Sequence, residues 1–412
     1  MAGMEIFGWL TFALTAAYAF RKPSGEYIQA MDLEPNLPWK TCLALLIITI
    51  LGFVVNGTET ADPLHNIGSQ RWMFLLATHS FALALWPPSI KGYKFFLFFT
   101  SVVAVYAIFQ SITGIDLMRP GSNRAVQPLD LEAAIPLWRS AGFYGSPLQY
   151  GYNFGQFVCL PLAMVLLMAR EKSTRNGIFW FSLIAYVLIS LSIVTTFTRG
   201  AWIASGLAHL LMAFIVSWRL AACLSGIGGA VLAILFFTVE QFRLRVLTFF
   251  DFNYASNSDR LLLWKANLQM FKDYPILGIG YQENETRSGE YLARLGYPDA
   301  FTGHAHSNYL QMLAGTGITG FVTYMFLISF MLWLTWRLWK ALPKDMIWQR
   351  AIALGALGAQ IQLHIGGFTE CNFQRGTTNH ILMVVWGLVI STMALLKLGR
   401  LEQVDTKPQA GL

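Results

Sequence analysis

Long uninterrupted apolar runs are the feature that most restricts how this chain can fold. Phe95–Ile112 and Ile178–Thr196 contain no charged residue. Such runs approach or reach the roughly 17 to 25 residues that an α-helix needs to cross a bilayer. Only 12% of the 412 residues are charged, about half the fraction of a soluble globular domain. The sequence therefore predicts an all-α, polytopic membrane protein.

Eleven apolar segments are expected to span the membrane. They lie near residues 6–20, 41–55, 72–86, 95–111, 153–169, 178–196, 200–216, 220–238, 318–336, 350–365 and 380–396. The first has no basic region before it and no small-residue cleavage motif after it, so it is interpreted as a retained span rather than a signal peptide. A re-entrant segment over Leu129–Trp138 could raise the total, so we expect about 11–12 transmembrane helices.

Basic residues in short loops orient these spans. Arg170, Lys172 and Arg175 share one loop, and Arg337, Lys340 and Lys344 share another, so the positive-inside rule places both loops in the cytoplasm. The long polar segments then face the opposite side. We expect one integral domain over residues 1–402, a large helical periplasmic loop over 239–317 that carries the site motifs, and a disordered cytoplasmic tail over 403–412.

The net charge of +7 reflects this topology, because the basic residues are dispersed among short loops and do not form one stripe. Membrane lipids are therefore expected partners, and nucleic acid is not. Three of the four cysteines lie in apolar stretches, and only Cys371 lies in a polar loop. No disulfide framework is predicted.

The polar stretch Ser256–Glu285 is predicted to form a capped amphipathic helix that ends at Pro275. Ser258 or Asp259 could cap its first turn. One face would contain Leu261, Trp264, Leu268 and Phe271.

Two arginines on the extracytoplasmic side suit an anion. Arg260 would lie in the first helical turn, where a bound anion could use both its guanidinium and the free backbone N–H groups. Alternatively, Arg260 pairs with Asp259 or with another carboxylate of the loop. Arg199 lies in a very short connection between two spans, where a charge is costly unless it faces a cavity, a partner or the membrane interface. Together the two would suit a diphosphate.

His304 and His306 precede the span near 318–336. In a helix their side chains would point about 200° apart, whereas in an extended segment they would share a face. Zinc would need a third protein ligand, and only loosely placed candidates such as Asp299 or His364 exist, so no metal is predicted. The histidines could be structural, or one could bind substrate or take a proton from a hydroxyl.

Three motifs resemble those of the O-antigen ligase and Wzy-type polymerase superfamily, which includes bacterial O-oligosaccharyltransferases. TTFTRGAW resembles its S/T-R-G-x-W segment, and SDRLLLWKANLQMFKDYPILGIGY resembles its R-x-x-x-W…P-x-x-G-x-G element. HAHSNYLQMLAGTGITG resembles its H-x-H-N-x-x-L-Q…G-x-x-G element, although Ser307 here precedes Asn308. The resemblance extends from about Phe154 to Leu396.

The resemblance implies a GT-C-like fold and a metal-independent, inverting glycan transfer without a cofactor. The donor would be an undecaprenyl-pyrophosphate-linked glycan, used at the periplasmic face of the bacterial inner membrane. Arg199 and Arg260 would bind the donor pyrophosphate, and His306 would be the general base. Further candidates in a supporting role are His304, Asn308, Tyr309, Trp264, Arg287 and Arg375. Glu370 and His364 are candidates only for an outer shell around this site.

The acceptor is the main open choice. A ligase would use lipid A–core oligosaccharide, a Wzy-type polymerase another lipid-linked glycan, and an O-oligosaccharyltransferase a protein. We favour the ligase. A transporter of lipid-linked sugars is the non-enzymatic alternative, but paired half-repeats are not evident in the sequence.

Overall fold

The computed structural model describes residues 37–57, 63–120, 125–129, 136–251, 254–373 and 376–401. Within them the chain is almost entirely helical, which confirms the all-α prediction. The predicted span near 6–20, the tail over 403–412 and Arg375 lie outside the described residues. The strands are the short pair β1 (Gln127–Pro128) and β2 (Trp138–Arg139), which are antiparallel. Most of the predicted re-entrant segment, residues 130–135, lies outside the described residues.

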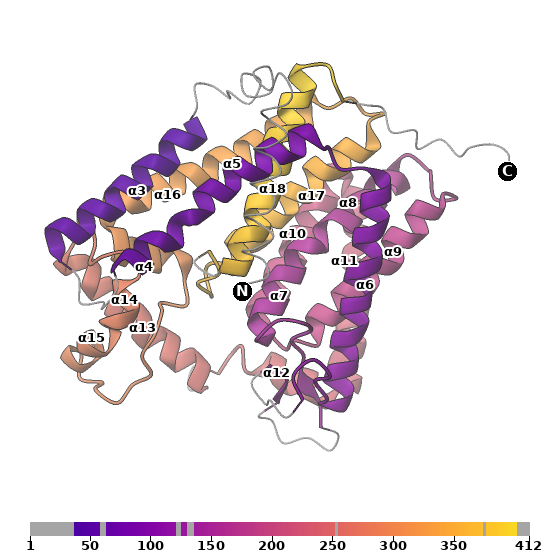
Figure 1. Cartoon of the computed structure of the whole chain (residues 1–412). Helices are drawn as coiled ribbons and strands as arrows, with labels where there is room; N and C mark the ends of the chain where they lie inside the picture. Colours follow the sequence, from indigo (N-terminus) through magenta and orange to yellow (C-terminus); the bar gives the residue numbers. More distant parts are fainter. Residues whose placement is uncertain are drawn as a thin grey trace. The chain divides into compact units, whose positions relative to one another are not determined.

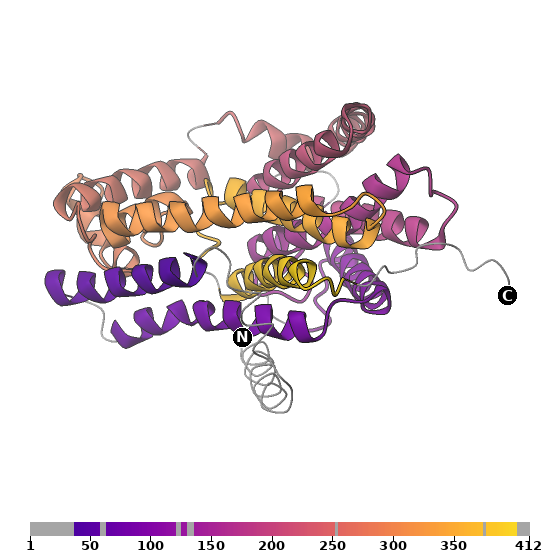
Figure 2. The ribbon, with the colours of Figure 1, turned by 90° about the horizontal axis from the view of Figure 1, so that it is seen from above.

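Eight described helices are long and apolar enough to cross a membrane, so the chain is a multi-pass membrane protein. They comprise α3 (Leu37–Asn56), α6 (Ile90–Thr113), the continuous pair α7 (Pro147–Phe157) and α8 (Cys159–Arg170), α9 (Gly177–Val194), α10 (Arg199–Val216), α11 (Trp218–Thr238), α16 (Asn308–Ala341) and α18 (Gly376–Lys397). The long orange helix of Figure 2 is α16.

Two further predicted spans form helices that fall outside this group. The segment near 72–86 is α5 (Trp72–Leu85), whose 14 residues are fewer than the roughly 17 needed to cross a bilayer. The segment near 350–365 is α17 (Ile347–Gly366), which is long enough but more polar. Its Gln360 donates to Thr335 Oγ1 (2.8 Å) and accepts from Trp386 Nε1 (3.0 Å), so helix partners satisfy this buried amide.

The described chain divides into two compact units. The first contains residues up to 79, 250–334 and 365–384, and the second contains 80–249, 335–364 and the residues from 385 onward. In the second unit, α6 and α8 pack against α9, and α10 packs against α7, α8 and α11. The short helix α12 (Glu240–Leu247) follows α11.

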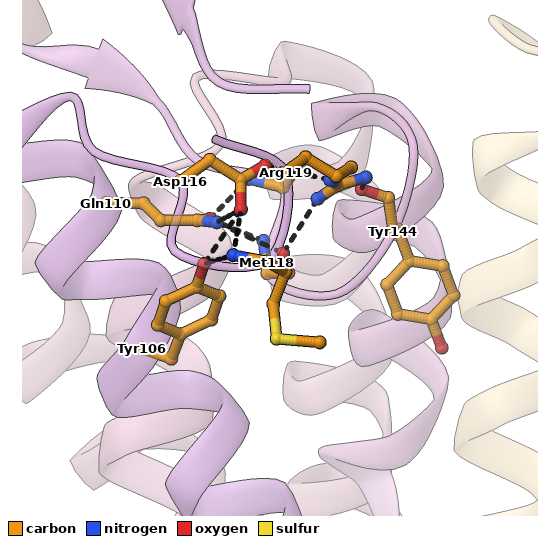
Figure 3. A network of polar contacts seen from close by, with 8 residues as sticks. Tyr106, Gln110, Asp116, Met118, Arg119 and Tyr144 are labelled. Atoms are coloured by element: carbon orange, nitrogen blue, oxygen red, sulfur yellow. Dashed lines mark hydrogen bonds and ion pairs between the residues drawn. The ribbon is translucent and has the colours of Figure 1, made fainter. Parts of the chain in front are cut away.

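A polar network ties the loop after α6 to the backbone near β2 and α7 (Figure 3). Asp116 accepts from Tyr106 (2.8 Å) and from Nε of Arg119 (2.8 Å), while Arg119 also donates to the carbonyl of Gly142 (3.1 Å). Burial raises the pKa of Asp116, but the hydrogen bond from Tyr106 and the charge of Arg119 outweigh it and lower the pKa. Arg119 is therefore committed to holding this loop.

In the first unit, α4 (Pro63–Gly68) and the 3₁₀ turn η1 (Ser69–Arg71) precede α5. The polar loop contributes α13 (Ala255–Asp273), α14 (Glu283–Thr286) and α15 (Ser288–Arg294), which lie together in Figure 1. Leu263, Met270, Ile279, Tyr291 and Leu292 form most of their apolar core.

The structure corrects two details of α13. The helix begins at Ala255 without a side-chain cap, and Ser258 donates to the carbonyl of Ala255 instead of capping. Arg260 is therefore the sixth residue of the helix, beyond its first turn. The buried face contains Leu263, Ala266, Asn267 and Met270, whereas Leu261 and Leu268 are 41% and 43% exposed. The end near Pro275 is as expected.

Candidate active site

His304 and His306 lie in a non-helical loop immediately before α16. His306 adopts a left-handed conformation with φ of 46°, which is uncommon for a residue other than glycine. The backbone N–H of His306 donates to Nδ1 of His304 (3.1 Å), and the two ring centroids are 4.1 Å apart. Both histidines therefore belong to one site, as they would in the extended alternative.

Glu370, from the connection between α17 and α18, contacts both histidines. Its carboxylate lies 3.1 Å from Nδ1 of His306 and 3.6 Å from Nε2 of His304, and the residue is only 5% exposed. Burial raises the pKa of Glu370, but the hydrogen bond with His306 and the charges of His306, His304 and Arg260 together lower it. Glu370 is therefore ionised at neutral pH.

The carboxylate of Glu370 selects the tautomer of His306. An ionised carboxylate only accepts hydrogen bonds, so Nδ1 of His306 is the protonated nitrogen and Nε2 keeps its lone pair. Nδ1 of His304 accepts a backbone N–H, so the proton of neutral His304 is on Nε2, toward Glu370. The side chain of His306 is 20% exposed, so it can meet a substrate. This arrangement can support general-base chemistry.

Asn308 joins the histidine loop to the segment that carries Glu370. Its backbone N–H donates to the carbonyl of Gly367 (2.7 Å), its side-chain amide donates to Asn372, and its side-chain oxygen accepts from the backbone N–H of Phe373 (3.0 Å). Asn308 is buried and committed to these contacts. It therefore holds Glu370 beside the histidines.

A chain of buried amides connects the same loop to α13. Gln311 accepts from the backbone N–H of Ala305 (2.8 Å) and donates to Asn284 (2.9 Å). Asn284 in turn donates to Asn267 on α13 (2.6 Å). Each amide thus both donates and accepts, which fixes the loop relative to α13.

The glycines of the second and third motifs pack backbone against backbone. Ile279 donates to the carbonyl of Ala314 (2.9 Å), and Ile318 donates to the carbonyl of Pro275 (2.9 Å). Gly317 interrupts the helical conformation of α16 with φ of 63°. A Cβ on Gly278, whose φ is +74°, would lie 2.4 Å from the backbone nitrogen of Gly317. These glycines therefore allow a close approach.

Arg260 and Trp264 lie one turn apart on α13. Arg260 contributes positive charge near Glu370. Two donors, Nε of Arg260 and Nε1 of Trp264, are buried and have no hydrogen-bond partner among the described residues. An anion would supply the acceptor that both donors lack.

Arg199 is the first residue of α10, in the second unit, and is only 7% exposed. Its guanidinium donates to the carbonyl (2.6 Å) and hydroxyl (3.0 Å) of Thr248 and lies 5.4 Å from the ring centroid of Phe249. Arg245 of α12 donates to the carbonyl of Phe197 (3.1 Å), which lies two residues before Arg199. Arg199 is thus buried and held by polar contacts, as a charge at a helix junction requires.

The remaining predicted residues have local contacts. Tyr309 packs against Phe368 with ring centroids 4.5 Å apart. Arg287 forms an ion pair with Glu290 (3.1 Å) and lies 5.6 Å from the ring centroid of Tyr274. Arg375 lies outside the described residues.

Glu370 also supplies the third metal-binding group that the sequence could not place. One ligand atom from each of His304, His306 and Glu370 lies within 4.8 Å of the others. Neither of the two loosely placed candidates is part of this group. The three residues could therefore hold a metal ion, although no metal is predicted from the sequence.

The sequence indicates only an outer-shell role for Glu370, whereas the structure places its carboxylate against both histidines. The available signal was a carboxylate in a short polar loop on the predicted side of the histidines. His364, the other such candidate, is buried in α17 within the second unit.

Comparison with known families agrees with the motifs. A family model described as O-Antigen ligase matches residues 184–325. A search of curated proteins found no match to the chain. All three motifs lie inside the matched segment, which also carries Arg199, Arg260 and both histidines. Residues 184–325 therefore belong to the O-antigen ligase/Wzy superfamily, and the chain is a multi-pass membrane protein.

Proposed function

We propose that the protein transfers a glycan from undecaprenyl pyrophosphate to a hydroxyl of lipid A–core oligosaccharide, with inversion and without a metal or other cofactor. The reaction takes place at the periplasmic face of the bacterial inner membrane, within one integral domain over residues 1–402, and the loop over 239–317 carries the site motifs. The observation that carries the proposal is the contact of Nδ1 of His306 with the buried carboxylate of Glu370.

In the proposed reaction, Nε2 of His306 removes the proton of the acceptor hydroxyl. The oxygen attacks the anomeric carbon while the bond from that carbon to the diphosphate oxygen breaks, and the diphosphate leaves with the electron pair. Arg260 and Arg199 bind the diphosphate and stabilise its charge. The carboxylate of Glu370 stabilises the protonated imidazole, as in other acid–histidine pairs. His304, Asn308, Tyr309, Arg287 and Arg375 support the site, by holding the loops or lining their rim.

Two features support base chemistry over a metal. A metal ion at this site would need the carboxylate of Glu370 as its third ligand. That carboxylate already accepts the proton of Nδ1 of His306, and the positive charge of Arg260 also acts on it. Transfer should therefore persist after treatment with a chelator. Restoration of chelated protein only by added zinc would contradict the metal-independent mechanism.

The acceptor is tested by mixing purified protein with undecaprenyl-pyrophosphate glycan, with and without lipid A–core. A ligase attaches the glycan to the core and makes no product without it. A ladder of longer lipid-linked chains in the absence of core would identify a Wzy-type polymerase instead. Modification of a protein acceptor would identify an O-oligosaccharyltransferase, and movement of the donor across vesicles without transfer would identify a transporter.

Replacing Arg260 by alanine is expected to raise the Kd for undecaprenyl pyrophosphate about 10- to 100-fold, because hydrogen bonds to charged groups contribute about 1.5–3 kcal/mol. Arg294→Ala is the matched control, since Arg294 belongs to the same loop but is half-exposed and pairs with Asp273 and Glu290. Equal donor affinity in both variants, measured by direct binding, would remove Arg260 from the donor site.

Replacing Glu370 by glutamine is expected to lower kcat about 10- to 100-fold, because the neutral amide no longer selects the His306 tautomer or stabilises the imidazolium. The change should also alter acid stability. The lowered pKa of Glu370 means that its stabilising contribution is present above the usual value of 4.5 and is lost as pH falls through the lowered value. Thermal unfolding of the wild type should therefore be more sensitive to acid in that range than unfolding of Glu370→Gln.

A further inference from the structure

The indole N–H of Trp264 is a buried donor with no acceptor among the described residues, and the same is true of Nε of Arg260. A buried donor without a partner costs about 1–3 kcal/mol, so such groups are rare in folded proteins. Two of them on one helix, four residues apart, are neighbours on the same face. The pair indicates a place where a ligand would supply a hydrogen-bond acceptor.

The neighbouring contacts indicate which part of the site this face adjoins. Asn267, three residues beyond Trp264, accepts from Asn284, and Asn284 accepts from Gln311 near the start of α16. Arg260 acts electrostatically on Glu370, which contacts both histidines. The two donors therefore border the histidine site and do not belong to the apolar core around Leu263.

The chemistry of the donors restricts the ligand atom. Indole and guanidinium N–H groups only donate hydrogen bonds, so a ligand oxygen that only accepts suits them best. A sugar hydroxyl both donates and accepts, whereas the oxygens of an ionised diphosphate only accept. Arg260 adds a positive charge, which favours the anion further.

We propose that Trp264 binds the donor substrate by donating its indole N–H to an oxygen of the diphosphate, beside the hydrogen bond from Nε of Arg260. The inference rests on the proposed function and assigns to Trp264 a role in donor affinity. Trp264 is neutral, so it orients the diphosphate while Arg260 supplies the charge. The acceptor substrate does not contact the indole N–H of Trp264.

The test compares Trp264→Phe with Trp264→His and Trp72→Phe. Phenylalanine keeps an aromatic ring but lacks the N–H, whereas histidine restores a ring N–H. Trp72 is the matched control, because its indole N–H is also buried without a partner in the part of the chain that the structure describes. Its ring packs against Phe373 in the same unit. The measurements are the Kd for undecaprenyl pyrophosphate, the KM for donor and for acceptor, and the thermal unfolding temperature.

We expect Trp264→Phe to raise the donor Kd and donor KM about 10-fold or more, with the acceptor KM unchanged. Trp264→His should recover part of the donor affinity, and Trp72→Phe should remain within about twofold of the wild type. If Trp264→Phe does not fold, Trp264→His tests the ring N–H by the same measurements. Wild-type donor affinity in Trp264→His would then support the proposed hydrogen bond to the diphosphate.

Unchanged donor affinity in folded Trp264→Phe would overturn the inference. Equal losses in Trp264→Phe and Trp264→His, or a similar loss in Trp72→Phe, would overturn it as well, since ring shape or folding would then explain the effect. These outcomes leave the proposed function intact. Failure of the wild type to transfer glycan from the diphosphate donor would instead contradict the proposed function.

Discussion

Replacing His306 by alanine is expected to lower the rate of glycan transfer by about 10²- to 10⁴-fold, which is the usual contribution of a general base. The change removes Nε2 of His306, the nitrogen that we propose accepts the proton of the acceptor hydroxyl. Donor affinity should change little, because Arg199 and Arg260 carry the proposed contacts with the diphosphate. Single-turnover transfer and direct binding of undecaprenyl pyrophosphate measure the two quantities separately.

His304→Ala is the informative comparison for this experiment. His304 lies against the same carboxylate, but its Nδ1 accepts the backbone N–H of His306 and its Nε2 faces Glu370 (3.6 Å). Loss of the His304 side chain should loosen the left-handed turn at His306. The transfer rate of His304→Ala should therefore fall, but by less than that of His306→Ala. Wild-type turnover by His306→Ala would exclude it as the base, and a larger defect in His304→Ala would exchange the two roles.

The apolar runs were sufficient to predict most helices. The segment expected near 178–196 is α9 (Gly177–Val194), and the one expected near 200–216 is α10 (Arg199–Val216). A run of this length without charges has few alternatives to a helix when backbone groups are in lipid. The segment 72–86 also forms a helix, but α5 has only 14 residues, so hydropathy alone overestimated its length.

The local sequence pattern does not determine which face of α13 is buried. Leu261, Leu262 and Leu263 are consecutive, so an apolar stripe can be drawn through more than one face of the helix. Tertiary contacts choose the face that contains Ala266 and Asn267. Asn267 is polar, and its place in the interior depends on Asn284, which lies 17 residues later. Hydrophobic periodicity cannot indicate that Asn284 is the partner of Asn267.

Glu370 illustrates the same limit at the site. It lies 64 residues after His306, so no short motif contains both. Spacing alone left the relative direction of His304 and His306 open, because the answer depends on the backbone of the loop. The left-handed φ of His306 and the hydrogen bonds of Asn308 determine that backbone. The histidine pair was therefore visible in the sequence, whereas its contact with the carboxylate of Glu370 was not.

Replacing Gly278 by alanine is expected to destabilise the loop that carries the site and to abolish most activity. Gly278 has a φ of +74°, and a Cβ there would lie 2.4 Å from the backbone nitrogens of both Thr316 and Gly317. Backbone atoms cannot rotate away as a side chain can. The left-handed conformation costs about 1–2 kcal/mol, and the forced separation adds about 1–3 kcal/mol.

Gly296→Ala separates these two costs. Gly296 also has a positive φ, +88°, but a Cβ there would meet nothing within 4 Å. Both variants should therefore show the conformational cost, and only Gly278→Ala should show the clash. Thermal unfolding and protease susceptibility of residues 254–303 measure the difference. Because the segment around Gly278 pairs with residues 314–318 of α16, displacement there should also move the histidine loop. Equal stability and equal transfer in the two variants would show that this close approach does not hold the site together.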